Sequence, residues 1–453
     1  MNEKVDSQLI VIFGASGDLT GRKLIPSLYE LHKRDLLPEK LCVMGAARTE
    51  YTDEEFRNVQ RENLEHSQKG KELKPGDIDA FLEHICYVSF DSGKSSDYYK
   101  LKDRITEKQT ALNLPDKVMY YLATPPQMYD LIPQYLQENG MNIAATLEGW
   151  RRVIIEKPFG TSLETARALN KKLMSIFDEK EIYRIDHFLG KEPAQNILAF
   201  RFANGLFEPI WNRNFIDHIQ IDIPEMLGLD ARANFYESTG AYKDMVVTHL
   251  FQVMAFVVME PPTALEPRAI SEEKNKVFRS MLPVKVSDVV RGQFTGYREL
   301  EGVARDSDTE TFIALKVGID NWRWAGVPIY LRTGKKMAEG MRIISIAFKE
   351  APRTMFPSGS GVGSQGPDHL TFDLADNSKV SLSFYGKRPG PGMKLEKLSM
   401  QFSTQETEYS DDVLEAYERL ILDAMRGDHT LFTTAEGIES LWANSAALLA
   451  DPP

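Results

Sequence analysis

The first third of the chain alternates short apolar runs with amphipathic stretches, and this alternation constrains the fold more than any other feature. Helix-like stretches such as Lys23–Arg34 and Asp53–Glu65 separate the runs. Strands that alternate with helices are joined by right-handed crossovers, so the pattern predicts a doubly wound α/β domain with a parallel sheet covered on both faces. The runs, rich in Val, Ile, Tyr or Phe, are Gln8–Phe13, Leu41–Gly45, Ile85–Phe90, Val118–Ala123 and Arg152–Glu156.

Beyond about residue 185, strand-like segments follow one another with little helix between them. Two helical segments, Tyr242–Met259 and Val413–Arg426, are expected to cover the resulting sheet. We therefore predict two domains: a Rossmann-like domain over residues 1–183, and an α+β domain over 184–453 with a large, mostly antiparallel sheet. The predicted strands of the second domain are His218–Ile223, Thr311–Val317, Pro328–Arg332, Ile343–Phe348, His369–Leu374 and Lys379–Tyr385.

Charge and cysteine content exclude several classes of function. The chain has 54 basic and 66 acidic residues, a net charge of −12, which argues against nucleic-acid or anionic-membrane binding. Cys42 and Cys86 are too few for a disulfide framework or a four-cysteine zinc site. The most apolar stretch, Met245–Met259, is shorter than the roughly 20 residues of a membrane span. These features predict a cytoplasmic protein.

A glycine-containing loop follows the first predicted strand directly. Glycine lets backbone N–H groups approach a pyrophosphate, and the N-terminus of the next helix adds partial positive charge. Ser16 and Leu19 stand where the second and third glycines of G-x-G-x-x-G would be, so an ordinary strand–turn–helix is the alternative. The position after the first strand favours a dinucleotide. The candidate residues are Gly14, Ala15, Ser16, Gly17, Asp18 and Leu19.

The end of the second predicted strand indicates which dinucleotide binds. NAD-selective sites place a carboxylate there to hold the ribose 2′-OH. This chain has Arg48, whose guanidinium suits a 2′-phosphate. We therefore predict NADP as the cofactor, with NAD as a weaker alternative. A solvated loop arginine is the competing interpretation.

Polar residues at two further element ends suggest a site for a phosphorylated ligand. Lys157 closes the apolar run Arg152–Glu156, and ligands of open α/β sheets bind at the carboxyl ends of strands. His187 and Lys191 precede Pro193, which favours a helix start, so two possible cations lie before a helix N-terminus. The alternatives are a solvent-exposed strand-end lysine and an ordinary loop.

His249 interrupts an otherwise apolar helical segment that also contains Asp244. Residues five apart are about 140° apart around a regular α-helix, so this spacing argues against a direct pair. A carboxylate from elsewhere, such as Asp186, is a better partner for His249. Isolated histidines of this kind are more often core residues than catalysts. The sequence contains no His-Glu-x-x-His or Cys/His cluster and does not call for a metal.

Together these segments resemble the glucose-6-phosphate dehydrogenase family, from about residue 9 to about residue 445. The segments occur in the family's order and at about its spacing. The combination of EKPFG with RIDH-x-LGK is specific. The matching segments are GASGDLT, EKPFG, RIDHFLGK, RFANGLFEPIWN, DMVVTHL, LRTGKK and EAYERLILD.

The resemblance implies roles for individual residues. His249 falls at the general-base position and Asp186 at the carboxylate paired with it. Lys157 corresponds to a lysine that touches both cofactor and sugar. The loop from Gly14 to Leu19 and Arg48 fall on the NADP site. The implied substrate ligands are Lys157, His187, Lys191, Glu225, Asp244 and Lys335.

The implied reaction is oxidation of D-glucose 6-phosphate at C1 to 6-phospho-D-glucono-1,5-lactone, with hydride transfer to NADP. It is the first step of the oxidative pentose phosphate pathway. The resemblance also implies a homodimer or homotetramer formed through the large sheet. Phe188 replaces a family tyrosine, and Gly340 replaces a second basic substrate ligand of many members. Two alternatives remain open: a sugar oxidoreductase of the glucose–fructose oxidoreductase type, and an NADP-binding sensor without turnover.

Overall fold

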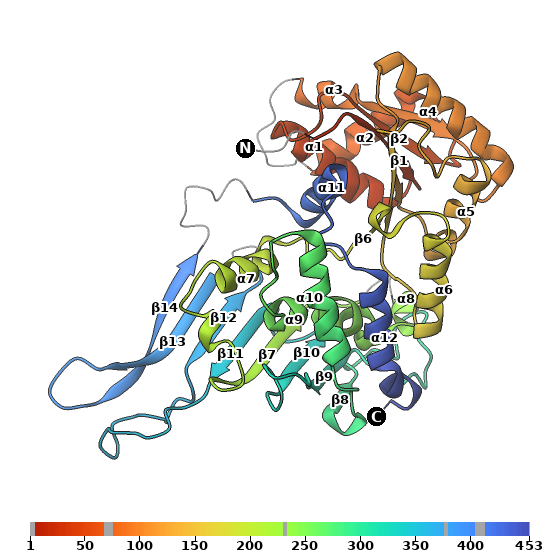
Figure 1. Ribbon diagram of the computed structural model, residues 1–453. Helices are drawn as coiled ribbons and strands as arrows, with labels where there is room; N and C mark the ends of the chain where they lie inside the picture. The colour runs from red at the N-terminus through yellow and green to blue at the C-terminus, as the bar shows by residue number, and fades with distance from the viewer. Residues whose placement is uncertain (1–4, 68–75, 230–232, 376–378, 404–412, 453) are drawn as a thin grey trace. The chain divides into compact units, whose positions relative to one another are not determined.

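Two sheets organise the computed structural model, which describes residues 5–67, 76–229, 233–375, 379–403 and 413–452 (Figure 1). They belong to two compact units. The first contains residues up to Gly190, the short piece Glu266–Arg268 and the later segment Leu414–Ala435. The second contains Lys191–Leu265, Ala269–Val413 and Glu436–Pro453. The division into domains at residue 183 stays a prediction.

The sheet of the first unit has six parallel strands in the order β3-β2-β1-β4-β5-β6. This is the strand order of dinucleotide-binding folds, so the predicted doubly wound class is confirmed. Sequence analysis missed only β6, which has three residues and too little sequence to show a pattern. The strands are β1 Gln8–Phe13, β2 Leu41–Ala47, β3 Ile85–Ser89, β4 Lys117–Leu122, β5 Trp150–Ile155 and β6 Ile182–Arg184.

Helices on both faces of this sheet explain why its strands are mostly apolar. Every residue of β1 is buried, as a central parallel strand requires. Ser162 caps the N-terminus of the α6 helix: its hydroxyl accepts a hydrogen bond from the Thr165 backbone N–H at 3.2 Å. The helical elements are η1 Thr20–Leu24, α1 Ile25–Lys33, α2 Asp53–Ser67, α3 Asp77–Leu82, α4 Tyr98–Leu112, α5 Leu131–Glu138 and α6 Leu163–Met174, with short 3-10 turns Ser95–Asp97, Pro126–Met128 and Glu179–Glu181.

The late helix α11 (Ala416–Arg426) belongs to the first unit, although we expected it to cover the second sheet. Two contacts hold its C-terminal end. The Arg152 guanidinium of β5 donates to the carbonyls of Ala424 and Met425, both at 2.7 Å, and the Gln8 amide of β1 donates to Met425 at 3.3 Å. The expectation was wrong because amphipathic periodicity identifies a buried helix face without showing which sheet buries it.

His429 lies just beyond α11, with its ring stacked on Tyr183 at 3.9 Å. Burial, assisted by the Arg152 charge, lowers the pKa of His429 to about 4 from 6.5. Because the folded pKa is depressed, the folded state binds fewer protons than the unfolded state between these values. The contribution of neutral His429 to the free energy of unfolding is therefore fully present above pH 6.5, and it is lost as the pH falls toward 4.

Replacing His429 with phenylalanine should therefore reduce the acid sensitivity of the protein while keeping a ring against Tyr183. Between pH 7.5 and pH 4.5, the free energy of unfolding of the variant should fall by about 2 kcal/mol less than that of the parent. Urea unfolding at the two pH values measures this difference. His66→Phe, at an exposed position of α2, is the control and should leave the pH dependence unchanged. Equal pH dependence in H429F and the parent would contradict the prediction.

The sheet of the second unit has eight strands in the order β14-β13-β12-β11-β7-β10-β9-β8. Its neighbouring strands are antiparallel except β7 and β10, which run parallel, so the predicted mostly antiparallel sheet is confirmed. Sequence analysis missed the two edge strands, β8 and β14. The strands are β7 Ile216–Pro224, β8 Val289–Gly292, β9 Phe312–Val317, β10 Ile329–Gly334, β11 Ile343–Phe348, β12 His369–Asp373, β13 Lys379–Lys387 and β14 Leu395–Ser403.

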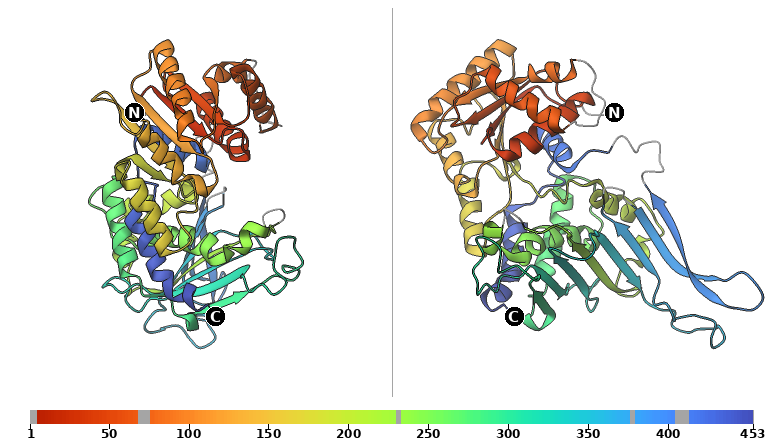
Figure 2. Two further views of the ribbon diagram at one scale, coloured as in Figure 1. Left: turned by 90° about the vertical axis from the view of Figure 1, so that its right-hand side faces the viewer. Right: turned by 180° about the vertical axis from the view of Figure 1, so that it is seen from behind.

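Helices α7, α9 and α10 lie on one face of this sheet, and the long strands β13 and β14 extend beyond them (Figure 2). The apolar helix α9 is buried along its whole length, as expected for a helix within Met245–Met259, the most apolar stretch of the sequence. Among the described residues, no helix has the length and apolar character to cross a bilayer. The helical elements are α7 Glu192–Phe202, α8 Ala233–Glu237, η7 Tyr242–Leu250, α9 Phe251–Val258, α10 Pro267–Ser280 and α12 Ala435–Ala450, with short 3-10 turns Glu208–Ile210 and Val286–Asp288.

The last carbonyls of α9 are bonded by side chains, which explains motif residues that have no predicted role in chemistry. The Trp211 indole donates to Val257 and the Trp324 indole to Val258, both at 2.7 Å. Arg201 donates to the neighbouring carbonyls of Phe256 and Met259 at 2.9 and 2.8 Å. A buried helix end needs such partners because its final carbonyls have none within the helix. The RFANGLFEPIWN segment thus anchors this helix.

Candidate functional site

The backbone of the loop after β1 lies very close to the ends of the neighbouring strands. Gly14 has a φ of +78°, and a Cβ there would lie 2.3 Å from the Ala123 carbonyl oxygen. Its N–H donates to the Ala46 carbonyl at 2.9 Å, so the loop starts between the ends of β2 and β4. Ser16, Gly17 and Asp18 are exposed where the helical segment begins. A tight glycine turn at a helix N-terminus fits a pyrophosphate.

Arg48 lies where a second-strand cofactor residue is expected. The β2 strand ends at Ala47, and Arg48 follows it in an exposed position. The bond between Gly14 and Ala46 places the start of the glycine loop beside this strand end. Asp18 is engaged by Arg22 at 2.6 Å on the exposed surface. The loop and Arg48 can therefore face one nucleotide, with the guanidinium available to a 2′-phosphate.

The ends of β5 and β6 carry the next group of predicted residues. Lys157 follows β5 by two residues, and Asp186 and His187 follow β6 at the same edge of the sheet. Asp186 is only 2% exposed, and its carboxylate accepts a hydrogen bond from the Phe188 backbone N–H at 2.9 Å. Because β5 and β6 are parallel neighbours, a lysine, a buried carboxylate and a histidine lie at the edge of the sheet where ligands bind in such folds.

Lys191 stands at the start of α7, as the Pro193 signal predicted. It is the N-cap residue in extended conformation, with proline in the first turn of the helix. The Ala194 N–H donates to the Lys191 carbonyl at 3.0 Å and closes this turn. An ammonium group beside the partly positive helix N-terminus suits an anionic group such as a phosphate.

In the second unit, Glu225 and Lys335 meet although 110 residues separate them in the sequence. They immediately follow β7 and β10, whose parallel register pairs Pro224 with Gly334. The Glu225 N–H also donates to the Gly334 carbonyl at 2.8 Å. The Lys335 ammonium forms an ion pair with Glu225 and lies 3.8 Å from the Asp244 carboxylate. One cation between two carboxylates presents both charged and hydrogen-bonding groups to a polyhydroxylated ligand.

The segment with Asp244 and His249 is π-helical over Tyr242–Leu250, which corrects the geometry assumed from the sequence. The Phe251 N–H bonds to the Val246 carbonyl, five residues earlier. In a helix with i to i+5 bonds, residues five apart lie nearly above one another, so Asp244 and His249 share a face. The 140° separation expected for an α-helix does not apply. Nothing in the residue pattern signals a π-helix, and His249 itself is 1% exposed.

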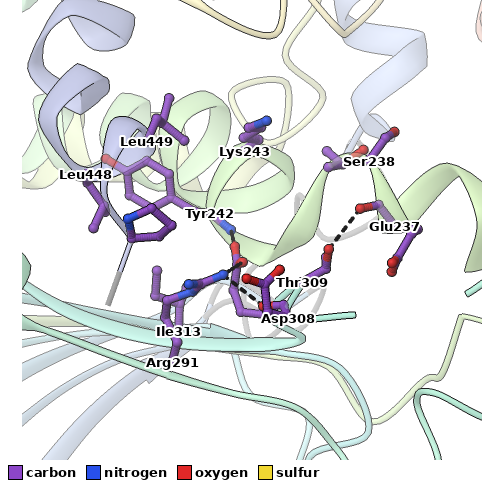
Figure 3. Close-up of a pocket in the computed structure, with 13 residues that line it drawn as sticks. Glu237, Ser238, Tyr242, Lys243, Arg291, Asp308, Thr309, Ile313, Leu448 and Leu449 are labelled. Carbon is purple, nitrogen blue, oxygen red and sulfur yellow. Dashed lines mark hydrogen bonds and ion pairs between the residues drawn. The ribbon is translucent and has the colours of Figure 1, made fainter. Parts of the chain in front are cut away.

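Glu310 fixes the start of this π-helix, and sequence analysis missed it. Its carboxylate accepts the Tyr242 N–H and bonds Arg291, both at 2.9 Å, and its carbonyl accepts the Ala241 N–H at 3.0 Å. Tyr242 and Arg291 line a pocket, shown in Figure 3, that contains none of the predicted site residues. We assign this pocket a structural part in anchoring η7. No sequence signal could have linked Glu310 to Tyr242 across 68 residues.

Comparisons with known proteins agree with this geometry. Models of the glucose-6-phosphate dehydrogenase NAD binding domain and C-terminal domain match residues 11–196 and 198–452. The glucose-6-phosphate 1-dehydrogenase of Aggregatibacter actinomycetemcomitans is 42% identical over 458 residues, covering 97% of this chain and 90% of the relative.

Two solved structures are similar over nearly the whole chain. A glucose-6-phosphate dehydrogenase in complex with its substrate glucose-6-phosphate has a TM-score of 0.89 at 31% identity, over 99% of this chain and 92% of that one. The glucose-6-phosphate 1-dehydrogenase of Mycobacterium avium has a TM-score of 0.85 at 33% identity, over 99% and 93%.

The glycine loop at the edge of a parallel sheet places the chain among dinucleotide-binding proteins, and the relatives it matches make it an oxidoreductase. The family models cover almost all of the sequence. The chain belongs to the glucose-6-phosphate dehydrogenase family, for which NADP is the standard cofactor.

Proposed function

We propose that this chain oxidises D-glucose 6-phosphate at C1, giving 6-phospho-D-glucono-1,5-lactone and reduced NADP. The proposal rests on family membership, and the observation that carries it furthest is the π-helix, which turns Asp244 and His249 to one face. A base and a sugar-binding carboxylate on one face can serve one sugar ring. NADP, when bound, supplies the hydride acceptor.

The proposed catalytic residues are His249, Asp186 and Lys157. His249 takes the proton of the C1 hydroxyl, which allows the C1 hydrogen to leave as hydride. Asp186 stabilises the imidazolium that forms and fixes the ring tautomer. Lys157 holds the C1 oxygen beside the cofactor site. Asp186 is buried and already holds the backbone of Phe188, which supports its part as a fixed orienting group.

The proposed substrate ligands separate into two groups. His187 and Lys191 take the 6-phosphate, because they offer two possible cations near the start of α7. The sugar hydroxyls bind to Glu225, Asp244 and Lys335. In this cluster the two carboxylates can accept hydrogen bonds from the hydroxyls and the ammonium can donate to them. Phe188 cannot supply a hydroxyl to the phosphate, so we expect the two cations to carry that contact.

A cofactor-reduction assay tests the function. Glucose 6-phosphate, glucose and galactose 6-phosphate are each supplied with NADP and with NAD, and the reduced nicotinamide is followed by its absorbance. We expect turnover to be fastest with glucose 6-phosphate and NADP. Equal activity on glucose would favour an oxidoreductase of the glucose–fructose oxidoreductase type. NADP binding without reduction would favour a sensor.

Replacing Arg48 with alanine should lower the preference for NADP over NAD. We expect the ratio of kcat/KM for the two cofactors to fall by about 10- to 100-fold, since a charge-assisted contact to the 2′-phosphate is lost. Arg22→Ala is the control, because this exposed arginine is engaged by Asp18 at the same edge of the sheet. An unchanged cofactor ratio in R48A would remove Arg48 from the site.

We propose that the chain is a cytoplasmic homodimer or homotetramer. The exposed apolar side chains of β14 support assembly through the large sheet: Leu398, Met400 and Phe402 are 42%, 60% and 54% exposed. Clusters of this kind on a sheet face are typical of interaction surfaces. The free cysteines Cys42 and Cys86 support a reducing compartment. Light scattering measures the molecular mass of the parent and of Met400→Asp, and we expect a lower mass for the variant. An oligomer of equal mass in the variant would show that β14 does not form the interface.

A further inference from the structure

Two consecutive lysines after β10 each hold their ammonium group over an aromatic ring. The Nζ atom of Lys335 lies 5.9 Å from the centre of the Tyr236 ring. The Nζ atom of Lys336 lies 4.6 Å from the centre of the Phe294 ring. An ammonium group within about 6 Å of a ring centre is attracted to the negative face of the ring. Neither ring has a part in the function proposed above, although Lys335 does.

Both rings belong to one packed cluster of the second unit. Phe294 meets Tyr297 edge to face, with 5.5 Å between the ring centres. The Tyr297 hydroxyl donates to the carboxylate of Glu237, the residue after Tyr236, at 2.5 Å. Packing and this hydrogen bond fix the rings in one position. We call Tyr236, Phe294 and Tyr297 the aromatic platform, which packs with Leu229, Ala233, Leu300 and Val303.

The turn after β10 brings both lysines to the aromatic platform. The Lys335 N–H donates to the Thr311 carbonyl at 2.8 Å, and the Thr311 hydroxyl accepts the Phe294 N–H, also at 2.8 Å. Thr311 therefore joins the lysine turn directly to the platform. Lys336 has a φ of +51°, a conformation that a non-glycine residue adopts only where its surroundings impose it, and its N–H donates to the Leu227 carbonyl at 3.1 Å. Because successive side chains of a regular strand point to opposite faces, this turn allows both lysines to lie on one cluster.

The Lys335 ammonium lies between two carboxylates, and the ring gives it a third contact. It forms an ion pair with Glu225 and lies 3.8 Å from the Asp244 carboxylate. A lysine ammonium is carried by a flexible four-carbon stem, so ion pairing alone does not hold it in one place. The Lys335 side chain is only 15% exposed, so water screens its attraction to the Tyr236 ring little. The ring face therefore limits where the ammonium lies.

The ring of Tyr236 explains this residue better than its hydroxyl does. The hydroxyl is buried and has no hydrogen-bond partner among the residues that the structure describes. A buried hydroxyl without a partner destabilises the folded state, so phenylalanine would serve packing at least as well. Burial raises the pKa of Tyr236, and the neighbouring Asp244 charge acts in the same direction, so the ring stays neutral. The contact with Lys335 is thus made by the face of a neutral ring.

We propose that Tyr236 is a positioning residue for Lys335: the face of its ring holds the ammonium within reach of both Glu225 and Asp244. The ammonium and the two carboxylates then present a donor and acceptors to the sugar hydroxyls at the same time. The inference rests on the proposed function of Lys335 as a substrate ligand. Tyr236 touches no substrate in this scheme, so removing its ring should weaken sugar binding only through Lys335.

Tyr236→Leu removes the ring, and Tyr236→Phe removes only the hydroxyl. Calorimetry measures the Kd for glucose 6-phosphate in each variant. In Y236L we expect the Kd to rise about 10-fold, with a similar rise in KM and a kcat within about threefold of the parent. In Y236F the Kd should stay within about twofold of the parent, because the ring face remains. An equal rise in both variants would assign the effect to the hydroxyl and overturn the inference.

A cycle with Lys335→Met separates positioning from a purely structural part. In the parent, Y236L should lower kcat/KM for glucose 6-phosphate about 10-fold. In the K335M background it should change kcat/KM by less than about twofold, because the ammonium that the ring holds is already gone. A ring that only supports the fold would cause the same loss in both backgrounds, and that result would contradict the inference.

Tyr385→Leu is the matched control for the loss of a ring beneath a lysine. The Nζ atom of Lys397 lies 4.1 Å from the centre of the Tyr385 ring. These residues lie on β14 and β13, outside the proposed site. The Kd of this variant for glucose 6-phosphate should stay within about twofold of the parent.

Fluorinated phenylalanines in place of Tyr236 provide a second measurement if thermal unfolding shows that Y236L does not fold. Each fluorine withdraws negative charge from the ring face with little change in shape, so the attraction of a cation weakens from phenylalanine to trifluorophenylalanine. We expect the Kd for glucose 6-phosphate to rise stepwise along this series. An unchanged Kd with trifluorophenylalanine would show that the ring does not act on the ammonium.

The outcomes separate the inference from the proposed function. If the parent binds glucose 6-phosphate and K335M binds it weakly, but Y236L binds it as the parent does, only the inference is wrong. If the parent binds no glucose 6-phosphate, the proposed function fails and the inference falls with it.

Discussion

An His249→Asn variant is expected to lose about 10³- to 10⁴-fold in kcat while it still binds glucose 6-phosphate and NADP with nearly unchanged affinity. Asparagine keeps a polar side chain of similar size near Asp244 but has no basic nitrogen at neutral pH. The proton of the C1 hydroxyl then has no acceptor, and hydride cannot leave. The loss should therefore appear in turnover and not in the dissociation constants, which calorimetry measures on the inactive variant.

His218 provides the matched control for this experiment. It lies on β7 of the same unit, is half-buried and is bonded to Asp217 at 2.7 Å, outside the proposed site. His218→Asn should leave kcat within about twofold of the parent. In the parent, the acid limb of the kcat profile should reflect protonation of the base, and H249N should lack that limb. Near-normal turnover in H249N would remove His249 from the base role.

The parallel sheet was predictable because its strands are buried on both faces and therefore stand out as apolar runs. Five of its six strands were located within two residues of their ends. The exception, β6, has three residues. In the second unit, β14 was missed for a different reason. Its side chains are mostly exposed, so it lacks the alternation that a half-buried strand shows.

The candidate site was predictable where local chemistry suffices and unpredictable where it depends on register. The glycine loop, Arg48 and Lys157 follow strand ends, so their place could be derived from the sequence. The ion pair between Glu225 and Lys335 depends on β7 and β10 being neighbours in parallel, which only the tertiary structure shows. The common face of Asp244 and His249 depends on a π-helix, for which residue spacing gives no signal.

The second large effect is expected for Lys335→Met, which removes the cation between Glu225 and Asp244. Both half-buried carboxylates then lose the positive charge of Lys335. They repel, take up protons or move apart, and the sugar hydroxyls lose their ligands. Since breaking a partly buried ion pair costs several kcal/mol, we expect kcat/KM for glucose 6-phosphate to fall about 10²- to 10³-fold. Steady-state kinetics at saturating NADP measures this loss.

Arg332→Met is the matched control, since Arg332 lies in β10, the strand that Lys335 follows, and pairs with Asp222 of β7 at 3.1 Å on a more exposed part of the sheet. Loss of that pair should change kcat/KM by less than about threefold.

The double variant Lys335→Met with Glu225→Gln separates the causes, because the amide removes the repulsion with Asp244. If repulsion dominates, the double variant should recover part of the loss. If the ammonium itself binds the sugar, no activity returns. A K335M enzyme as active as R332M would show that the cluster binds no substrate.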